Sequence, residues 1–303
     1  MALEPPKPHG VFDLAMDDGA LIRVRHHGNR DGVRIYLGNG NGFAADGYFA
    51  FWGPLLEQFE LVVFDFRNHG WNPPSDHANH HYAQMSRDVE WVFQGMTAAL
   101  GAKTSVGIFH SMSGRAAMKH AIEIGWRWDA LFLIDPPNVP PKGHRMYDLM
   151  DVFEHKLADW AMGRQDRFAD PAELAGQYAG TRAHGNWADG THDLMARSVL
   201  RLDDGTGDWI LACPRELEAA IYLAAMTLDL WPDCKEFAGP VKLIGADPEI
   251  RGAPGPAFAN RALAEDFGYV YEAIAGAGHL LQIQKPAESR RAVLSFMAEC
   301  GIG

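Results

Sequence analysis

The chain has 303 residues and carries a formal net charge of −12, from 27 Lys and Arg against 39 Asp and Glu. This excess of acidic residues argues against a nucleic-acid-binding surface or a polybasic membrane anchor, because both need clustered positive charge. With 47% hydrophobic and 22% charged residues, the composition is that of a folded globular protein, which excludes disordered and fibrous classes.

The amino terminus, MALEPPKPHG, lacks the basic region and the apolar run of a secretory signal. No stretch approaches the ~18 uninterrupted apolar residues that a membrane span requires. We therefore expect a cytoplasmic protein with neither a membrane nor a nucleic-acid partner.

The first part of the chain alternates strand-like and helix-like segments. Residues 11–16 and 21–25 flank the turn Asp17-Asp18-Gly19 and predict an antiparallel hairpin. Apolar runs then alternate with amphipathic stretches, which predicts a parallel sheet with crossover helices. The expected strands are 33–37, 61–64, 105–109 and 130–134, and the expected helices are 48–59, 85–100 and 114–124.

After Pro136-Pro137 the pattern changes. Residues 138–237 show helical periodicity and four tryptophans but no clear strand. Strands are expected again at 241–245 and 269–274, and a helix at 287–300 closes the chain. The sequence thus predicts an α/β core, residues 1–137 and 238–303, and a helical lid, residues 138–237.

The segment FHSMSG, residues 109–114, joins an expected strand to an expected helix, which is the setting of a nucleophile elbow. Such a turn lifts a serine hydroxyl out of the sheet at the helix N-terminus, where the dipole and free N–H groups favour negative charge. The usual pattern is small-x-Ser-x-small. Ser113 fits this pattern, whereas Phe109 is bulky and must find room beside the turn. Ser111 is therefore the candidate nucleophile.

A serine nucleophile needs a base, and the base needs an orienting carboxylate. His279 follows the last expected strand, after the small residues Gly-Ala-Gly, and is the candidate base. Asp247 ends the preceding expected strand and completes the chain order Ser, Asp, His, so we select it as the acid. Asp135, which also ends a strand, and Glu249 are the alternatives.

The developing oxyanion needs backbone donors. The N–H group of Met112, directly after the nucleophile, is one candidate. The glycine-rich loop that follows the strand at 33–37 lets the backbone approach a ligand, and we select the Phe43 N–H as the second donor.

Several motifs follow one another in the order typical of one family. Residues 65–70, DFRNHG, look like a DxRxHG turn, and Gly42-Phe43 look like an oxyanion loop. HSM at 110–112 matches a common elbow, and LIDPP at 133–137 looks like the strand end after which a lid is often inserted. The chain thus resembles the α/β-hydrolase family over nearly its whole length. The resemblance implies a mostly parallel eight-stranded sheet flanked by helices, with an inserted helical lid.

These residues predict a serine hydrolase that cleaves a small carboxylic ester with an apolar acyl or alcohol part and needs no cofactor. Serine at position 111 weighs against the dehalogenase and epoxide-hydrolase branches, which would need a carboxylate there. A lactonase or a carbon–carbon bond (diketone) hydrolase would use the same triad. A cofactor-free haloperoxidase-type enzyme and a ligand-binding receptor or pseudoenzyme also stay open. The sequence leaves the substrate and the oligomeric state undetermined, a homodimer included.

Potential metal ligands are sparse. His77, His80 and His81 occupy a polar loop without carboxylate spacing, so we expect no metal site there. His69 is expected to form structural hydrogen bonds. The cysteines lack CxxC spacing, which argues against a disulfide framework and a zinc knuckle. These expected free thiols are Cys213, Cys234 and Cys300.

Overall fold

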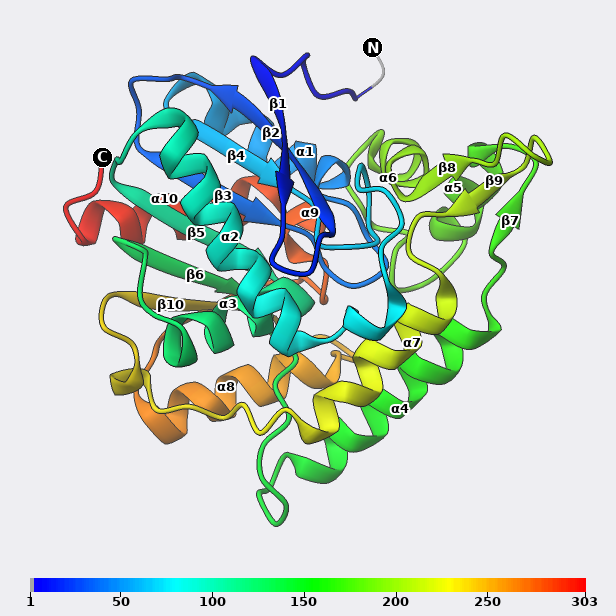
Figure 1. Cartoon of the computed structure of the whole chain (residues 1–303). Helices are drawn as coiled ribbons and strands as arrows, with labels where there is room; N and C mark the ends of the chain where they lie inside the picture. Colours follow the sequence, from blue (N-terminus) through cyan, green and yellow to red (C-terminus); the bar gives the residue numbers. More distant parts are fainter. Residues whose placement is uncertain (1–2) are drawn as a thin grey trace.

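A computed structural model describes residues 3–303 and contains a twisted eight-stranded sheet with helices on both faces (Figure 1). The strand order is β1-β2-β4-β3-β5-β6-β10-β11. β2 is antiparallel to β1 and β4, and the remaining neighbours are parallel. The strands are β1 (Gly10–Ala15), β2 (Leu21–Gly28), β3 (Arg34–Gly38), β4 (Glu60–Phe64), β5 (Ser105–His110), β6 (Ala130–Ile134), β10 (Val241–Ala246) and β11 (Val270–Ile274).

The central strands are buried on both faces, which explains why they read as continuous apolar runs. Successive side chains point to opposite faces: Ile35 joins the apolar layer that contains α1 and α10, and Tyr36 joins the layer that contains α2 and α3. The helices that accompany the sheet are α1 (Phe49–Trp52), α2 (Tyr82–Leu100), α3 (Met112–Glu123), α8 (Gly255–Phe267), α9 (Leu281–Gln284) and α10 (Pro286–Glu299).

The expected hairpin, the parallel strands and the mostly parallel eight-stranded sheet are all present. The helix expected over residues 48–59 is instead three short segments, the 3₁₀ turns η1 (Ala45–Tyr48) and η2 (Gly53–Glu57) on either side of α1. Gly53 and Pro54 follow α1 directly, and both residues disfavour a helix interior. Helix α8 was not predicted.

The segment 138–237 contains both helices and strands. The expectation of a wholly helical segment is wrong, because β7, β9 and β8 form a small antiparallel sheet. Strands of two or three residues are too short to give an alternating pattern. Helices α4 and α7 lie side by side at the lower right of Figure 1 and pack against each other. The elements of segment 138–237 are α4 (Tyr147–Gly163), β7 (Arg167–Phe168), α5 (Pro171–Ala179), α6 (Thr191–Val199), β8 (Leu200–Leu202), β9 (Trp209–Leu211), α7 (Arg215–Ala224), η4 (Ala225–Thr227) and η5 (Cys234–Glu236).

None of the helices within residues 3–303 is both long enough and apolar enough to cross a membrane.

Candidate active site

Ser111 lies between the last residue of β5, His110, and the first residue of α3, Met112. Its backbone has φ 55° and ψ −116°, a conformation that costs a non-glycine residue about 1–3 kcal/mol. Neighbouring hydrogen bonds hold this turn: the Ser111 N–H donates to Ile134 O at 2.9 Å. The Ser113 hydroxyl accepts from the His110 N–H and donates to His110 O, both at 2.9 Å. The segment therefore forms the sharp strand-to-helix turn that the sequence predicts.

Phe109 occupies the position where the elbow pattern has a small residue. Its side chain is fully buried, with its ring 5.5 Å from that of Trp128 and 6.2 Å from that of Phe64. Two glycines provide the space. A Cβ added at Gly38 would lie 3.0 Å from Cδ1 of Phe109, and one added at Gly107 would lie 2.8 Å from Cε2. The bulky residue is thus accommodated by glycines at these two positions.

His279 lies on the loop between β11 and α9 and faces Ser111. Its Nε2 is 2.9 Å from Ser111 Oγ, and its Nδ1 is 2.7 Å from Oδ2 of Asp135. Asp135 is fully buried directly after β6, and its Oδ1 accepts from the Ala246 N–H at 3.0 Å and from Nδ2 of Asn260 at 2.9 Å. Because a carboxylate can only accept, Nδ1 of His279 donates to Asp135, and this tautomer leaves Nε2 to accept from the serine hydroxyl.

Asp247, which the sequence favours as the acid, is not hydrogen-bonded to His279 in this structure, whereas Asp135 is. Asp247 forms other contacts. Its two carboxylate oxygens accept from the N–H groups of Gly276 and Glu249, each at 2.8 Å, and these bonds lower its pKa. Glu249 is exposed and pairs with Arg261 at 2.8 Å. Asp135, the alternative, contacts His279 because β6 adjoins β5 directly, whereas β10 lies one strand further away. Both strands end at the same edge of the sheet, so chain order alone does not distinguish them.

The loop after β3 places its N–H groups differently from the prediction. The Phe43 N–H donates to Gly40 O at 3.1 Å within a turn, so it is not free to bind an oxyanion. Within the described part of the chain, the Asn41 N–H is the one backbone donor of residues 40–43 that has no hydrogen bond. The other occupied donors and their acceptors are Gly40 to Tyr48 Oη at 3.0 Å and Gly42 to His69 Nε2 at 3.1 Å.

The DFRNHG turn after β4 supports this loop. Asp65 is fully buried and accepts from the Ala45 N–H at 2.7 Å. His69 donates from Nδ1 to Arg67 O at 2.9 Å, which leaves its Nε2 to accept from Gly42. Burial lowers the pKa of His69 to about 4, so the ring is neutral at neutral pH and keeps this acceptor. His69 thus forms the structural hydrogen bonds expected of it.

A histidine and cysteine cluster lies behind this loop. His69, His80 and Cys213 place one potential ligand atom each within 4.8 Å of one another. However, Nε2 of His69 accepts from Gly42, and Nδ1 of His80 accepts from Asn68 Nδ2 at 3.2 Å, so both imidazole lone pairs are engaged. Burial also raises the pKa of the Cys213 thiol well above its usual value. Among residues 3–303, Nε2 of His80 is buried without a hydrogen-bond partner, so the cluster is only partly hydrogen-bonded.

Only 5% of Ser111 is exposed, and side chains of segment 138–237 lie beside the loop that follows β3. An aromatic cluster from this segment surrounds the Phe43 ring. Its members and their centroid distances from Phe43 are Tyr178 at 6.4 Å, His184 at 6.2 Å and Trp187 at 6.2 Å.

Two buried ion pairs involve segment 138–237, and the sequence did not predict either of them. Arg164 contacts Glu218 at 2.8 Å, and the Glu218 carbonyl accepts from Asn41 Nδ2 at 2.8 Å. Arg115 of α3 contacts Glu154 of α4 at 2.6 Å, and burial raises the pKa of Glu154 to about 7. The second pair therefore links the helix that follows Ser111 to segment 138–237.

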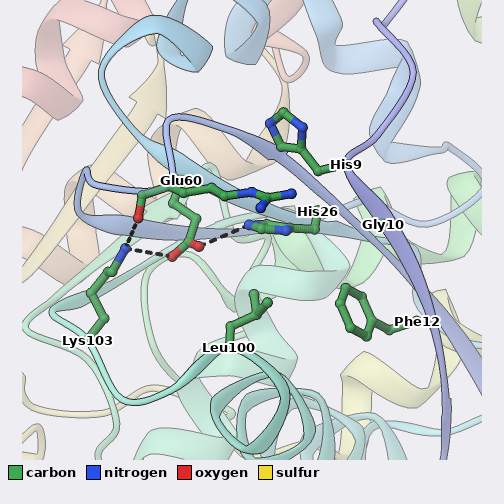
Figure 2. A pocket seen from close by; sticks show the side chains of 8 residues that line it. His9, Gly10, Phe12, His26, Glu60, Leu100 and Lys103 are labelled. Atoms are coloured by element: carbon green, nitrogen blue, oxygen red, sulfur yellow. Dashed lines mark hydrogen bonds and ion pairs between the residues drawn. The ribbon is translucent and has the colours of Figure 1, made fainter.

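A cavity of about 400 Å³ lies at the opposite edge of the sheet (Figure 2). Glu60, at the start of β4, projects into it and contacts His26 at 2.9 Å and Lys103 at 3.1 Å. Ser111 lies at the C-terminal ends of the parallel strands, whereas the cavity lies at their N-terminal ends. The cavity is therefore separate from the Ser111 site. Its lining residues are His9, Gly10, Phe12, His26, Arg30, Glu60, Leu100 and Lys103.

A model of the alpha/beta hydrolase family matches residues 35–292. The chain belongs to the alpha/beta hydrolase family. This alpha/beta hydrolase has the eight-stranded, mostly parallel sheet that its sequence predicts. No curated protein matches its sequence.

Solved structures share the fold of this alpha/beta hydrolase at low sequence identity. An E-2-(acetamidomethylene)succinate hydrolase is 17% identical, with a TM-score of 0.74 over 95% of this chain and 100% of that one. A bromoperoxidase from Bacillus anthracis is 17% identical, with a TM-score of 0.70 over 95% and 100% of the two chains. An esterase from Exiguobacterium antarcticum is 16% identical, with a TM-score of 0.66 over 94% and 98%.

Proposed function

We propose that this alpha/beta hydrolase is a serine esterase that cleaves carboxylic esters through an acyl-enzyme on Ser111. The observation that carries the proposal is the hydrogen-bonded line from Ser111 Oγ through His279 to Asp135, with distances of 2.9 and 2.7 Å. A strained serine at a strand-to-helix turn, an imidazole within hydrogen-bond distance of it and a buried carboxylate together provide an activated nucleophile.

In the proposed reaction, Ser111 Oγ attacks the ester carbonyl while Nε2 of His279 takes the hydroxyl proton. The imidazolium that forms is stabilised by the carboxylate of Asp135, which accepts hydrogen bonds from three donors. His279 then returns the proton to the departing alcohol. A water molecule, deprotonated by the same imidazole, releases the acid from Ser111.

The oxyanion would be held by two backbone donors, the N–H groups of Met112 and Asn41. Met112 begins α3, where the initial N–H groups have no partner within the helix. Asn41 takes the place of Phe43 in this proposal, because the Phe43 N–H is already bonded to Gly40 O. Each donor of this kind contributes about 10²–10³ in kcat in serine hydrolases.

The aromatic cluster around Phe43 supports an ester with an apolar acyl or alcohol part. We also propose that segment 138–237 acts as a lid. Only 5% of Ser111 is exposed, so a substrate reaches the hydroxyl when this segment moves away.

A panel of p-nitrophenyl esters of increasing acyl length, together with a lactone and a diketone, tests the proposal. We expect ester hydrolysis with a pre-steady-state burst of one p-nitrophenol per chain, and loss of both in the Ser111→Ala variant. Turnover of the lactone or the diketone alone would refute the ester assignment. Equal ester turnover by Ser111→Ala would refute the serine mechanism.

A further inference from the structure

A chain of buried hydrogen bonds joins three segments of the Ser111 site. The Gly40 N–H lies 3.0 Å from Tyr48 Oη, and Tyr48 Oη lies 2.9 Å from Nδ1 of His110. On the other side of the same ring, Nε2 of His110 lies 3.0 Å from the carbonyl oxygen of His279. The side chains of Tyr48 and His110, which form these hydrogen bonds, are both buried. The chain of hydrogen bonds therefore runs from the loop after β3, through the residue before the nucleophile, to the backbone of the base.

The direction of each bond follows from the chemistry of its groups. A carbonyl only accepts, so Nε2 of His110 carries the proton and donates to His279 O. In the neutral ring, Nδ1 then accepts from the Tyr48 hydroxyl, whose oxygen in turn accepts from the Gly40 N–H. Burial lowers the pKa of His110 well below its usual value, which keeps the ring neutral. Each of the three hydrogen bonds thus has a defined donor and a defined acceptor.

The same contacts fix how closely the loop approaches the elbow. A Cβ at position 40 would lie 2.7 Å from Nδ1 of His110 and 3.1 Å from Tyr48 Oη, so a glycine is required there. The rings of His110 and His279 are packed with centroids 4.9 Å apart. Asn41, the proposed oxyanion donor, directly follows Gly40. A shift of the Tyr48 hydroxyl would therefore move the peptide that carries this donor.

We propose that Tyr48 and His110 are positioning residues, which set the oxyanion loop and the base relative to Ser111 without touching the substrate. The inference rests on the proposed function, because it concerns how that site is held. Its consequence is that the Tyr48 hydroxyl and the His110 imidazole act on the rate of the chemical step rather than on substrate binding.

The Tyr48→Phe variant tests the inference, because it removes both bonds of the hydroxyl and retains the packing of the ring. We expect kcat per labelled serine to fall about 10–100-fold while KM changes less than about twofold, since small misplacements act on the transition state. Affinity for a boronic acid that forms a tetrahedral adduct with the serine should fall by a similar factor. Tyr36→Phe is the matched control: it removes the hydroxyl of another fully buried tyrosine, on β3, and should leave kcat unchanged.

Active-site labelling with a fluorophosphonate and thermal unfolding keep the test separate from misfolding and from failure of the proposed function. If the wild type itself is not labelled at Ser111, the esterase proposal fails. If Tyr48→Phe is fully labelled but turns over at the wild-type rate, the positioning role is refuted. It is also refuted if Tyr36→Phe loses as much kcat as Tyr48→Phe.

A second variant tests the hydrogen bond between His110 and the carbonyl oxygen of His279. His110→Asn places an acceptor near the position of Nδ1 but has no donor that reaches His279 O. We expect kcat to fall about 10-fold or more, again with little change in KM, because the backbone of the base loses its link to the elbow. Wild-type kcat in a correctly folded His110→Asn variant would remove His110 from the positioning role.

Discussion

The Asp135→Asn substitution distinguishes the two carboxylates that the sequence offers as partners of His279. The replaced oxygen, Oδ2, lies 2.7 Å from Nδ1 of His279, and the residue is fully buried. The Ala246 N–H and the Asn260 amide both donate to Oδ1, so the asparagine oxygen is held on that side. Its amide nitrogen then faces Nδ1 of His279 as a donor and favours the imidazole tautomer with the proton on Nε2. That tautomer cannot accept the proton of Ser111.

The expected loss is about 10⁴-fold in kcat, the effect of the equivalent change in a serine protease triad. This factor corresponds to about 5 kcal/mol of transition-state stabilisation. The matched control is Asp247→Asn, since Asp247 accepts only from the backbone N–H groups of Gly276 and Glu249. We expect this control to cost less than about 10-fold, because it weakens loop contacts and leaves the base oriented.

The assay is steady-state hydrolysis of the best p-nitrophenyl ester, with circular dichroism and thermal unfolding as checks of folding. The reasoning is refuted if Asp247→Asn is as inactive as Asp135→Asn. It is equally refuted if a folded Asp135→Asn variant keeps a tenth or more of the wild-type kcat.

Two further predictions concern stability. Burial lowers the pKa of His27 to about 4. Between about pH 6.5 and pH 4 the unfolded chain therefore binds a proton at this residue that the folded chain does not bind. The free energy of unfolding then falls by up to about 1.4 kcal/mol for each pH unit that the pH is lowered. His27→Phe keeps the packing against Trp52 and should lose less stability over this range in urea unfolding; parallel pH curves for variant and wild type would contradict this. Gly38→Ala places a Cβ 3.0 Å from Phe109 and should destabilise the fold by about 1–3 kcal/mol. Combined with Phe109→Leu, it should cost less than the sum of the two changes, whereas strict additivity would show that the two positions do not share this space.

The sequence predicts the sheet and the elbow well because their signals are local. Buried parallel strands appear as apolar runs, and the segment around Ser111 carries small and polar residues at the turn. His279 is recognisable because it follows the last strand of the sheet. Each of these features depends on a few residues that are neighbours in the sequence, so the local sequence pattern is sufficient to predict it.

Other features depend on contacts between distant segments. Asp135 and Asp247 both end parallel strands, and only the strand order shows which of them reaches His279. The sequence offers the Phe43 N–H as an oxyanion donor, but a turn occupies this group and leaves the Asn41 N–H free. This turn depends on the conformation of the whole loop, which a local pattern does not reveal. The strands β7 to β9 are too short to give a periodic signal.

The most direct test of the central claim is mass-spectrometric mapping of the residue that a fluorophosphonate or a slowly hydrolysed ester modifies. We predict a single adduct on Ser111 in the wild type, none in Ser111→Ala, and strongly slowed formation in His279→Ala. An adduct on another residue, or no adduct in a folded wild-type sample, would contradict the account.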